Sequence, residues 1–131
     1  MNTKPRDIIL SIKPKYWELI KAGKKTVEFR RKWVKDGTQI RQLWFYVSSP
    51  VQTISGWAYV RWVKKPLTIL WEGGHEEGAI DKETFDTYFD GLTEGYAIIL
   101  DQIVIVPSLP ADAVFPWWNR PPQNFMYVRE G

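Results

Sequence analysis

The sequence predicts a single α+β domain in which short helices flank β-strands. A length of 131 residues suits one domain with a sizeable core. Residues 8–33 follow the order strand, short helix, glycine turn and strand, and further apolar runs of strand length recur along the chain. We therefore expect one domain over residues 1–131, with an acidic helical insert at about residues 66–94.

The first strand and helix follow from local residue preferences. Residues 8–12 form an apolar, β-branched run of strand length. Pro14 pre-sets the first helical turn, and Gly23 suits the position just after the helix. A helix of about two turns is supported by an apolar face at i, i+3 and i+4 spacing: Tyr16, Leu19 and Ile20.

The strand after the glycine turn carries unusual charges. Strand alternation assigns Val27 and Phe29 to the core, so Glu28 and Arg30 project together from the other face, about 7 Å apart along the strand. Lys25 lies at the turn, where the backbone can direct its ammonium over the same face. Three such side chains make either an ion-pair cluster or a functional site, and exposed charges on strands are usually solvated and contribute little.

The same residues carry a family resemblance. Residues 23–30, GKKTVEFR, match the pattern G-x-K-x-x-E-x-R and resemble the signature of the ASCH domain family of the PUA-like superfamily. The recognisable part covers residues 8 to about 33. The resemblance implies a small PUA-like β-barrel with flanking short helices. It also implies a cleft beside the barrel in which Lys25, Glu28 and Arg30 meet RNA or a nucleobase.

The rest of the chain is predicted from its periodicity. The acidic insert reads as a short helix that runs into a Gly-rich loop holding His75, followed by a helix capped by Asp81 and ending at Gly91. Residues 107–122 contain five prolines and are expected to be extended rather than helical. Residues 1–6 are expected to be frayed. Further strands are expected at residues 41–47, 53–63, 95–106 and 124–128.

Composition excludes several classes of protein. The absence of cysteine excludes disulfides and thiolate zinc sites, and a single histidine, His75, argues against a histidine metal site or a Ser-His-Asp triad. We therefore expect no cofactor and no metal. No signal peptide or long apolar run is visible, so we expect a soluble, cytoplasmic protein without a membrane partner.

The net charge of +3 conceals a division between the two halves of the chain. Residues 1–65 contain 15 Lys and Arg against 4 Asp and Glu, whereas residues 66–131 contain 3 against 11. The balances are therefore +11 and −8, which sum to +3. A basic half is typical of a phosphate-binding surface, although the two halves can also interleave in space and neutralise each other.

These observations favour RNA or modified-nucleobase binding. Lysine and arginine would contact phosphate, Glu28 would accept hydrogen bonds from a base edge, and aromatic rings would stack on bases. Trp33, Trp57, Trp117 and Trp118 are expected to form a semi-exposed aromatic wall. The candidate nucleic-acid-binding residues are Lys13, Lys25, Glu28, Arg30, Arg31, Trp57, Trp117 and Gln123.

Two other functions remain open, so the sequence leaves undecided whether the chain is an enzyme. The first is a small metal-independent hydrolase, either a ribonuclease or similar to the N4-acetylcytidine amidohydrolases, with Lys25 and Glu28 as catalytic residues. In those deacylating relatives a threonine stands at the position of Glu28, so the nucleophile is missing here. The second is a protein-binding adaptor that uses the acidic insert and the basic half. Base identity and oligomeric state are left open.

Overall fold

The structure is a computed structural model that describes residues 4–129, and it has an α+β fold. The described strands form one mixed sheet of six strands, accompanied by four helices. The elements follow the chain in this order: β1 (Arg6–Ile12), α1 (Pro14–Lys21), β2 (Val27–Arg30), β3 (Ile40–Val47), β4 (Thr53–Pro66), α2 (Leu67–Gly78), α3 (Lys82–Tyr88), β5 (Glu94–Pro110), α4 (Ala111–Val114) and β6 (Phe125–Tyr127).

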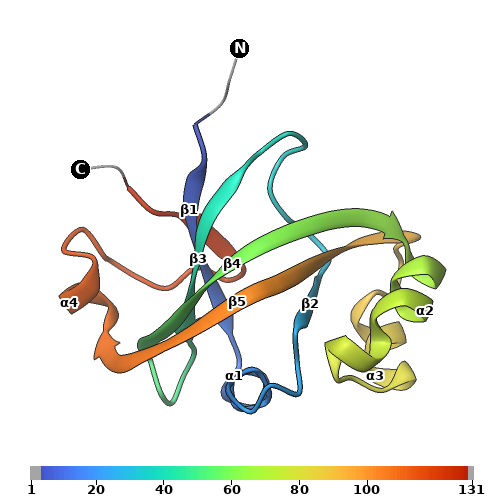
Figure 1. Cartoon of the computed structure of the whole chain (residues 1–131), viewed down its shortest axis with the longest axis horizontal. Helices are drawn as coiled ribbons and strands as arrows, with labels where there is room; N and C mark the ends of the chain where they lie inside the picture. Colours follow the sequence, from blue (N-terminus) through green and yellow to red (C-terminus); the bar gives the residue numbers. More distant parts are fainter. Residues whose placement is uncertain (1–3, 130–131) are drawn as a thin grey trace.

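The sheet is open rather than closed. Its strand order is β2-β5-β4-β3-β1-β6, so β2 and β6 lie at its edges. Only β1 and β3 run parallel; the other described pairs are antiparallel. The long strands β4 and β5 cross the whole molecule, with α4 near one end and α2 and α3 near the other (Figure 1). The barrel expected from the family resemblance is therefore not confirmed, whereas the α+β class is.

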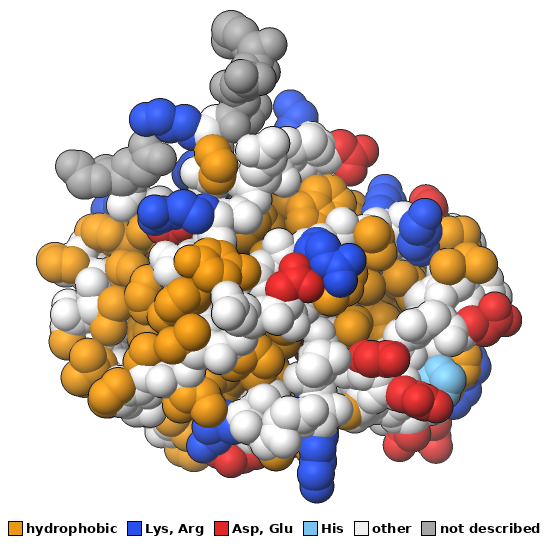
Figure 2. All heavy atoms as spheres, viewed as in Figure 1, with side chains coloured by type: hydrophobic (Ala, Val, Ile, Leu, Met, Phe, Trp, Pro, Cys, Tyr) orange, Lys and Arg blue, Asp and Glu red, His pale blue; other side chains and the backbone are white. Residues whose placement is uncertain are grey.

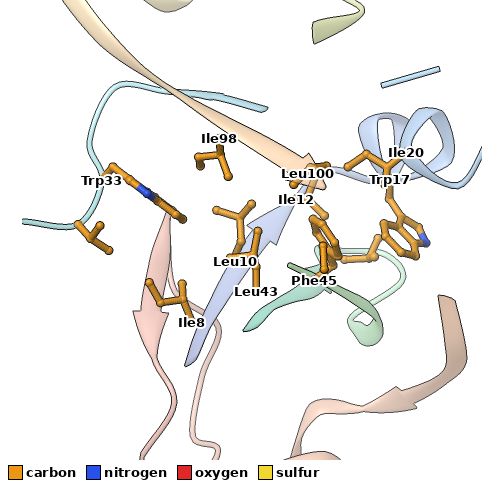
Figure 3. Close-up of a cluster of buried hydrophobic side chains, with 13 residues drawn as sticks. Ile8, Leu10, Ile12, Trp17, Ile20, Trp33, Leu43, Phe45, Ile98 and Leu100 are labelled. Atoms are coloured by element: carbon orange, nitrogen blue, oxygen red, sulfur yellow. The ribbon is translucent and has the colours of Figure 1, made fainter. Parts of the chain in front are cut away.

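The main core lies between the inner face of the sheet and α1. Alternate residues of β1 and β3, including Leu10 and Phe45, point toward the helix and are fully buried. Trp17 of α1 packs on Phe45, with ring centroids 5.2 Å apart. Figure 3 shows these side chains converging from β1, β3, β5 and α1. This core holds α1 against the sheet, and so fixes the start of the turn that carries Lys25.

A second core packs α2 and α3 against β2. Phe29 of β2 contacts Phe85 and Phe89, with ring centroids 5.2 and 6.3 Å apart. The ring of Phe29 also lies directly against Gly74 and Gly78 of α2, where a side chain would collide with it or press on it. The helix α2 therefore continues through the segment that the sequence predicted as a loop, and its glycines allow Phe29 to pack closely against it. The loop prediction for His75 is wrong: His75 lies in α2 and stacks on Trp71.

Other boundaries also differ from the sequence prediction. Arg6 is not frayed, because it pairs with Ile40 at the start of β1; residues 1–3 lie outside the described residues. The proline-rich segment is interrupted by the short helix α4, which begins after Pro110. Trp33 is only 8% exposed, because it packs on Phe125 in the main core, and it does not join a semi-exposed wall. None of the helices within residues 4–129 is long and apolar enough to cross a membrane.

Candidate functional site

A cavity of about 950 Å³ opens beside α1 and β2. Its floor is formed by the turn and strand that hold Lys25, Glu28 and Arg30. Its other lining residues come from the start of α1, from α3, from the β3–β4 turn and from residues 121–123. A cavity of this size is in the range of small-ligand sites.

Three charged side chains meet at Glu28. The Nζ of Lys25 lies 3.3 Å from Glu28 Oε1, and the Nε and Nη2 of Arg30 donate to Glu28 Oε2 at 2.9 and 2.6 Å. The exposed fractions of the three side chains, in chain order, are 2%, 9% and 12%. The structure therefore brings together the three residues that the sequence placed on one face, and it makes them a buried cluster rather than a solvated one.

The fold of the turn explains the position of Lys25. Gly23, with φ of 75°, ends α1 and reverses the chain, and Lys25 N donates to Leu19 O of that helix. The side chain is thereby directed inward, and Lys25 Nζ donates to Gly78 O at 2.5 Å. Gly78 is the last residue of α2, where unpaired carbonyl groups and the negative end of the helix dipole favour a cation.

Arg30 is held by the opposite edge of the sheet. Its Nη1 donates to Asn124 Oδ1 at 2.9 Å, and its Nη2 donates to Ser11 O at 2.7 Å. Asn124 also donates from Nδ2 to Lys32 O at 2.8 Å. Asn124 lies just before β6, so this side chain bridges the two unpaired edges, β2 and β6. Sequence reasoning did not single out Asn124, because only the tertiary fold brings it near Arg30.

Burial changes the proton affinity of Lys25. Loss of hydration lowers the pKa of its ammonium below the ordinary value of 10.5. The carboxylate of Glu28 opposes that effect, and the charge of Arg30 lowers the pKa further. The ring of Tyr16 lies 5.1 Å from Nζ. Lys25 is therefore a lysine that gives up its proton more readily than one in water.

The remaining candidate residues fall into two groups. Lys13 and Gln123 are exposed and line the cavity. Arg31, Trp57 and Trp117 are not among the lining residues. Arg31 binds the backbone carbonyl of Tyr88 through its guanidinium. Trp57 lies on the outer face of the sheet beside Trp44, and Trp117 packs on Phe115 after α4.

Several lining residues were not predicted. Tyr16 was expected only as part of an apolar helix face, yet it lines the cavity together with Tyr46 and Tyr88. Burial raises the pKa of the phenols of Tyr46 and Tyr88. Their roles could not be read from the sequence, since the three tyrosines come from α1, β3 and α3. Hydroxyl groups add polar contacts to the walls: Ser48, Ser49, Thr84 and Thr87.

The acidic insert faces the cavity through the start of α3. Asp81 and Glu83 line the cavity together with Lys13 and Lys15. Asp81 caps α3 as predicted, accepting a hydrogen bond from Thr84 N, and that bond lowers the pKa of its carboxyl. The two halves of the chain thus contribute opposite charges to one cleft. Residues 4–129 contain no group of three or more His, Cys, Asp or Glu side chains placed to hold a metal.

Comparison with known proteins identifies the family. The model of the ASCH domain family matches residues 10–103. This chain belongs to the ASCH domain family. The resemblance drawn from the GKKTVEFR motif is thereby confirmed, and the matched region extends well beyond the recognisable residues 8–33.

Proteins similar to this ASCH chain include ones from Zymomonas mobilis. An "ASCH domain-containing ribonuclease" of that bacterium is 30% identical over 128 residues, which cover 95% of this chain and 86% of the relative. A crystal structure of a serine-to-alanine mutant of ZmASCH has a TM-score of 0.85 at 26% identity and covers 95% of this chain and 89% of that one. The structure of ASCH from Zymomonas mobilis, at 24% identity and TM-score 0.84 with the same coverage, shows the same fold.

Proposed function

We propose that this ASCH chain binds single-stranded RNA in the cavity and cleaves it without a protein-bound metal ion. The observation that carries the proposal is the position of Lys25: its amine is buried, has a lowered pKa and lies on the floor of a cavity. The name of the ribonuclease relative supports RNA as the substrate. Perturbed groups in a cleft are typical of sites for proton transfer.

RNA can be cleaved by its own 2′-hydroxyl group. The 2′-oxygen loses its proton and forms a bond to the phosphorus, the bond from phosphorus to the 5′-oxygen breaks, and the leaving oxygen takes up a proton. The products are a 2′,3′-cyclic phosphate and a 5′-hydroxyl. Such a reaction needs a group that moves protons and a cation that stabilises the charge on the phosphate.

The charged cluster offers both groups. As a neutral amine, Lys25 Nζ has two hydrogens, which face the acceptors Gly78 O and Glu28 Oε1, and its lone pair is left for the substrate. A lowered pKa suits this amine to receive the proton of the 2′-hydroxyl. Arg30 keeps one Nη1 hydrogen without an acceptor in residues 4–129 and would bind the phosphate. Glu28 holds both side chains in place.

The proposal is tested with end-labelled single-stranded RNA in buffer containing EDTA. The wild type is expected to cleave the RNA and to leave cyclic phosphate ends, whereas an oligonucleotide with deoxyribose at the cleavage site remains intact. Lys25→Met is expected to lose cleavage. Lys24→Met is the matched control, because Lys24 is the neighbouring residue but is exposed and does not line the cavity.

A binding measurement with the same RNA at several salt concentrations separates cleavage from binding alone. Binding to phosphates must weaken as salt is raised, because bound RNA releases counterions. If the wild type binds RNA in this way but yields no product beyond that of Lys25→Met, the cavity binds RNA without cleaving it. If no binding is detected even at low salt, the whole proposal is refuted. Thermal unfolding of both variants shows whether each one is folded.

The two other candidate functions, an N4-acetylcytidine amidohydrolase and a protein-binding adaptor, receive no comparable support. An N4-acetylcytidine amidohydrolase of the kind suggested by the wider superfamily has a threonine where this chain has Glu28. The carboxylate of Glu28 is already engaged by Lys25 and Arg30, so it is not free to attack an amide. The adaptor hypothesis rests on the acidic insert and the basic half instead, whereas the name of the ribonuclease relative supports RNA.

A further inference from the structure

An unbroken series of aromatic rings runs from the cavity onto the outer face of the sheet. Tyr46, which lines the cavity, packs on Trp118 with ring centroids 5.1 Å apart. Trp118 neighbours Trp117 at 6.5 Å. The series then continues through rings whose neighbouring centroids lie 5.1 to 6.4 Å apart: Phe115, Trp44, Trp57 and Tyr59.

Tyr46 and Phe115 of this series are buried, and the other rings are partly open to solvent. Trp57, Trp117 and Trp118 are half-buried, and Tyr59 is 45% exposed. Figure 2 shows hydrophobic side chains gathered on the face where β4, β5 and α4 lie. Partly exposed aromatic side chains gathered on one face often mark a place where another molecule binds.

The charge of this surface favours a polyanion. Residues 42–60, which supply Trp44, Trp57 and Tyr59, contain no charged side chain. Residues 111–129, which include α4, contain Arg120 and Arg129 against one acidic residue, Asp112. The guanidinium of Arg129 lies 5.4 Å from the centre of the Trp117 ring. Aromatic faces combined with arginine are the chemistry that binds single-stranded nucleic acid with little dependence on base identity.

A short stretch of backbone joins the aromatic rings to the cavity wall. The chain that follows Trp118 leads within a few residues to residues 121–123, which form part of the cavity wall. Tyr46 provides a second link, because it touches both the cavity and Trp118. A strand with one nucleotide in the cavity would therefore meet aromatic rings where it leaves.

We propose that Trp57 and Trp117 belong to an outer stacking surface that binds the nucleotides of single-stranded RNA flanking the one in the cavity. This inference rests on the proposed function, since it takes the cavity as the anchoring point. It also gives a role to two tryptophans that the sequence indicated but that lie outside the cavity. Bases would stack on the exposed ring faces, and Arg120 and Arg129 would contact the phosphates.

The test compares binding of a dinucleotide and a decanucleotide, both of non-cleavable 2′-O-methyl RNA, by fluorescence polarisation. The wild type is expected to bind the decanucleotide more tightly. Trp57→Leu and Trp117→Leu keep apolar bulk but remove the aromatic face, and each is expected to weaken decanucleotide binding by about five-fold or more while leaving dinucleotide binding unchanged. Trp71→Leu is the control, because this half-buried tryptophan stacks on His75 in α2, away from the series.

A change in the RNA keeps the test valid if a variant fails to fold. A decanucleotide that is abasic outside its central dinucleotide retains the phosphates but offers no bases to stack, and the wild type is expected to bind it more weakly than the full decanucleotide. The outer surface is refuted if this abasic RNA binds as well as the full one, or if the variants weaken both RNA lengths equally. It is also refuted if sedimentation shows a second copy of the chain covering this face. In each of these outcomes the wild type would still bind the dinucleotide more tightly than Lys25→Met does. If the wild type binds the dinucleotide no better than Lys25→Met, the proposed function itself is refuted.

Discussion

Replacing Glu28 with glutamine should destabilise the fold strongly, because one buried carboxylate serves two cations. The substitution conserves shape but removes the counter-charge of Lys25 and Arg30, whose side chains are 2% and 12% exposed. Removing one partner of a buried ion pair typically costs about 3–5 kcal/mol. Two features lower the expected cost. Lys25 can lose its proton, and Arg30 keeps the oxygen acceptors of Asn124 and Ser11.

We therefore expect Glu28→Gln to lower the free energy of unfolding by about 3 kcal/mol at neutral pH. For a chain of this length that corresponds to a fall in Tm of roughly 10 °C. The measurement is urea unfolding followed by tryptophan fluorescence, with thermal unfolding as a second probe. The cost should shrink as pH rises, because the uncompensated Lys25 then becomes neutral.

The chain offers a matched control. Glu18 and Lys21 form an ion pair at the same three-residue separation, 3.0 Å apart, but their side chains are 67% and 37% exposed. Glu18→Gln should change the free energy of unfolding by less than about 0.5 kcal/mol. If Glu28→Gln is no more destabilising than Glu18→Gln, the cluster around Glu28 is solvated and the reasoning from burial is wrong.

Three further predictions concern the surroundings of the site. Burial lowers the pKa of Lys25, so between that pKa and 10.5 the unfolded chain binds more protons than the folded one. The free energy of unfolding of the wild type, relative to that of Lys25→Met, should therefore rise with pH across that window. A difference that does not change with pH would contradict this prediction. Gly78→Ala should cost about 1–3 kcal/mol, because its Cβ would lie 2.4 Å from the ring of Phe29. Gly73→Ala in the same helix is the control, because its Cβ would meet nothing within 4 Å, and it should stabilise the fold by about 0.5–1 kcal/mol. Equal effects of the two substitutions in urea unfolding would refute the packing argument. Asn124→Ala removes the side chain that bridges β2 and β6 and should cost about 1–2 kcal/mol in the same assay, whereas a neutral result would mean that the bridge is dispensable.

The sequence was most informative where local rules act alone. Alternation along residues 26–30 predicts that Val27 and Phe29 face a core and that Glu28 faces the other way, and the structure agrees. Capping by Asp81 and the turn at Gly23 also follow from residue type. These features depend on neighbours within a few residues, so single-sequence reasoning can reach them.

Features that depend on distant segments were missed. The glycines of α2 indicated a loop, but two of them, Gly74 and Gly78, allow close packing against Phe29, which lies on β2. The pairing of Arg30 with Asn124 joins residues 94 positions apart. The cavity likewise takes its walls from α1, the β3–β4 turn, α3 and residues 121–123, so its shape and its tyrosines could not be read from any one stretch.

The most direct test of the RNA site is nuclear magnetic resonance of the lysine side chains during titration with a non-cleavable dinucleotide. The wild-type protein is used, so no substitution disturbs the buried cluster. We predict a saturable shift of the Lys25 ε-methylene signals and no comparable shift of those of Lys24, which is exposed and lies outside the cavity. Dinucleotide binding that leaves the Lys25 signals unchanged would show that RNA is bound elsewhere and would contradict the assignment of this cavity.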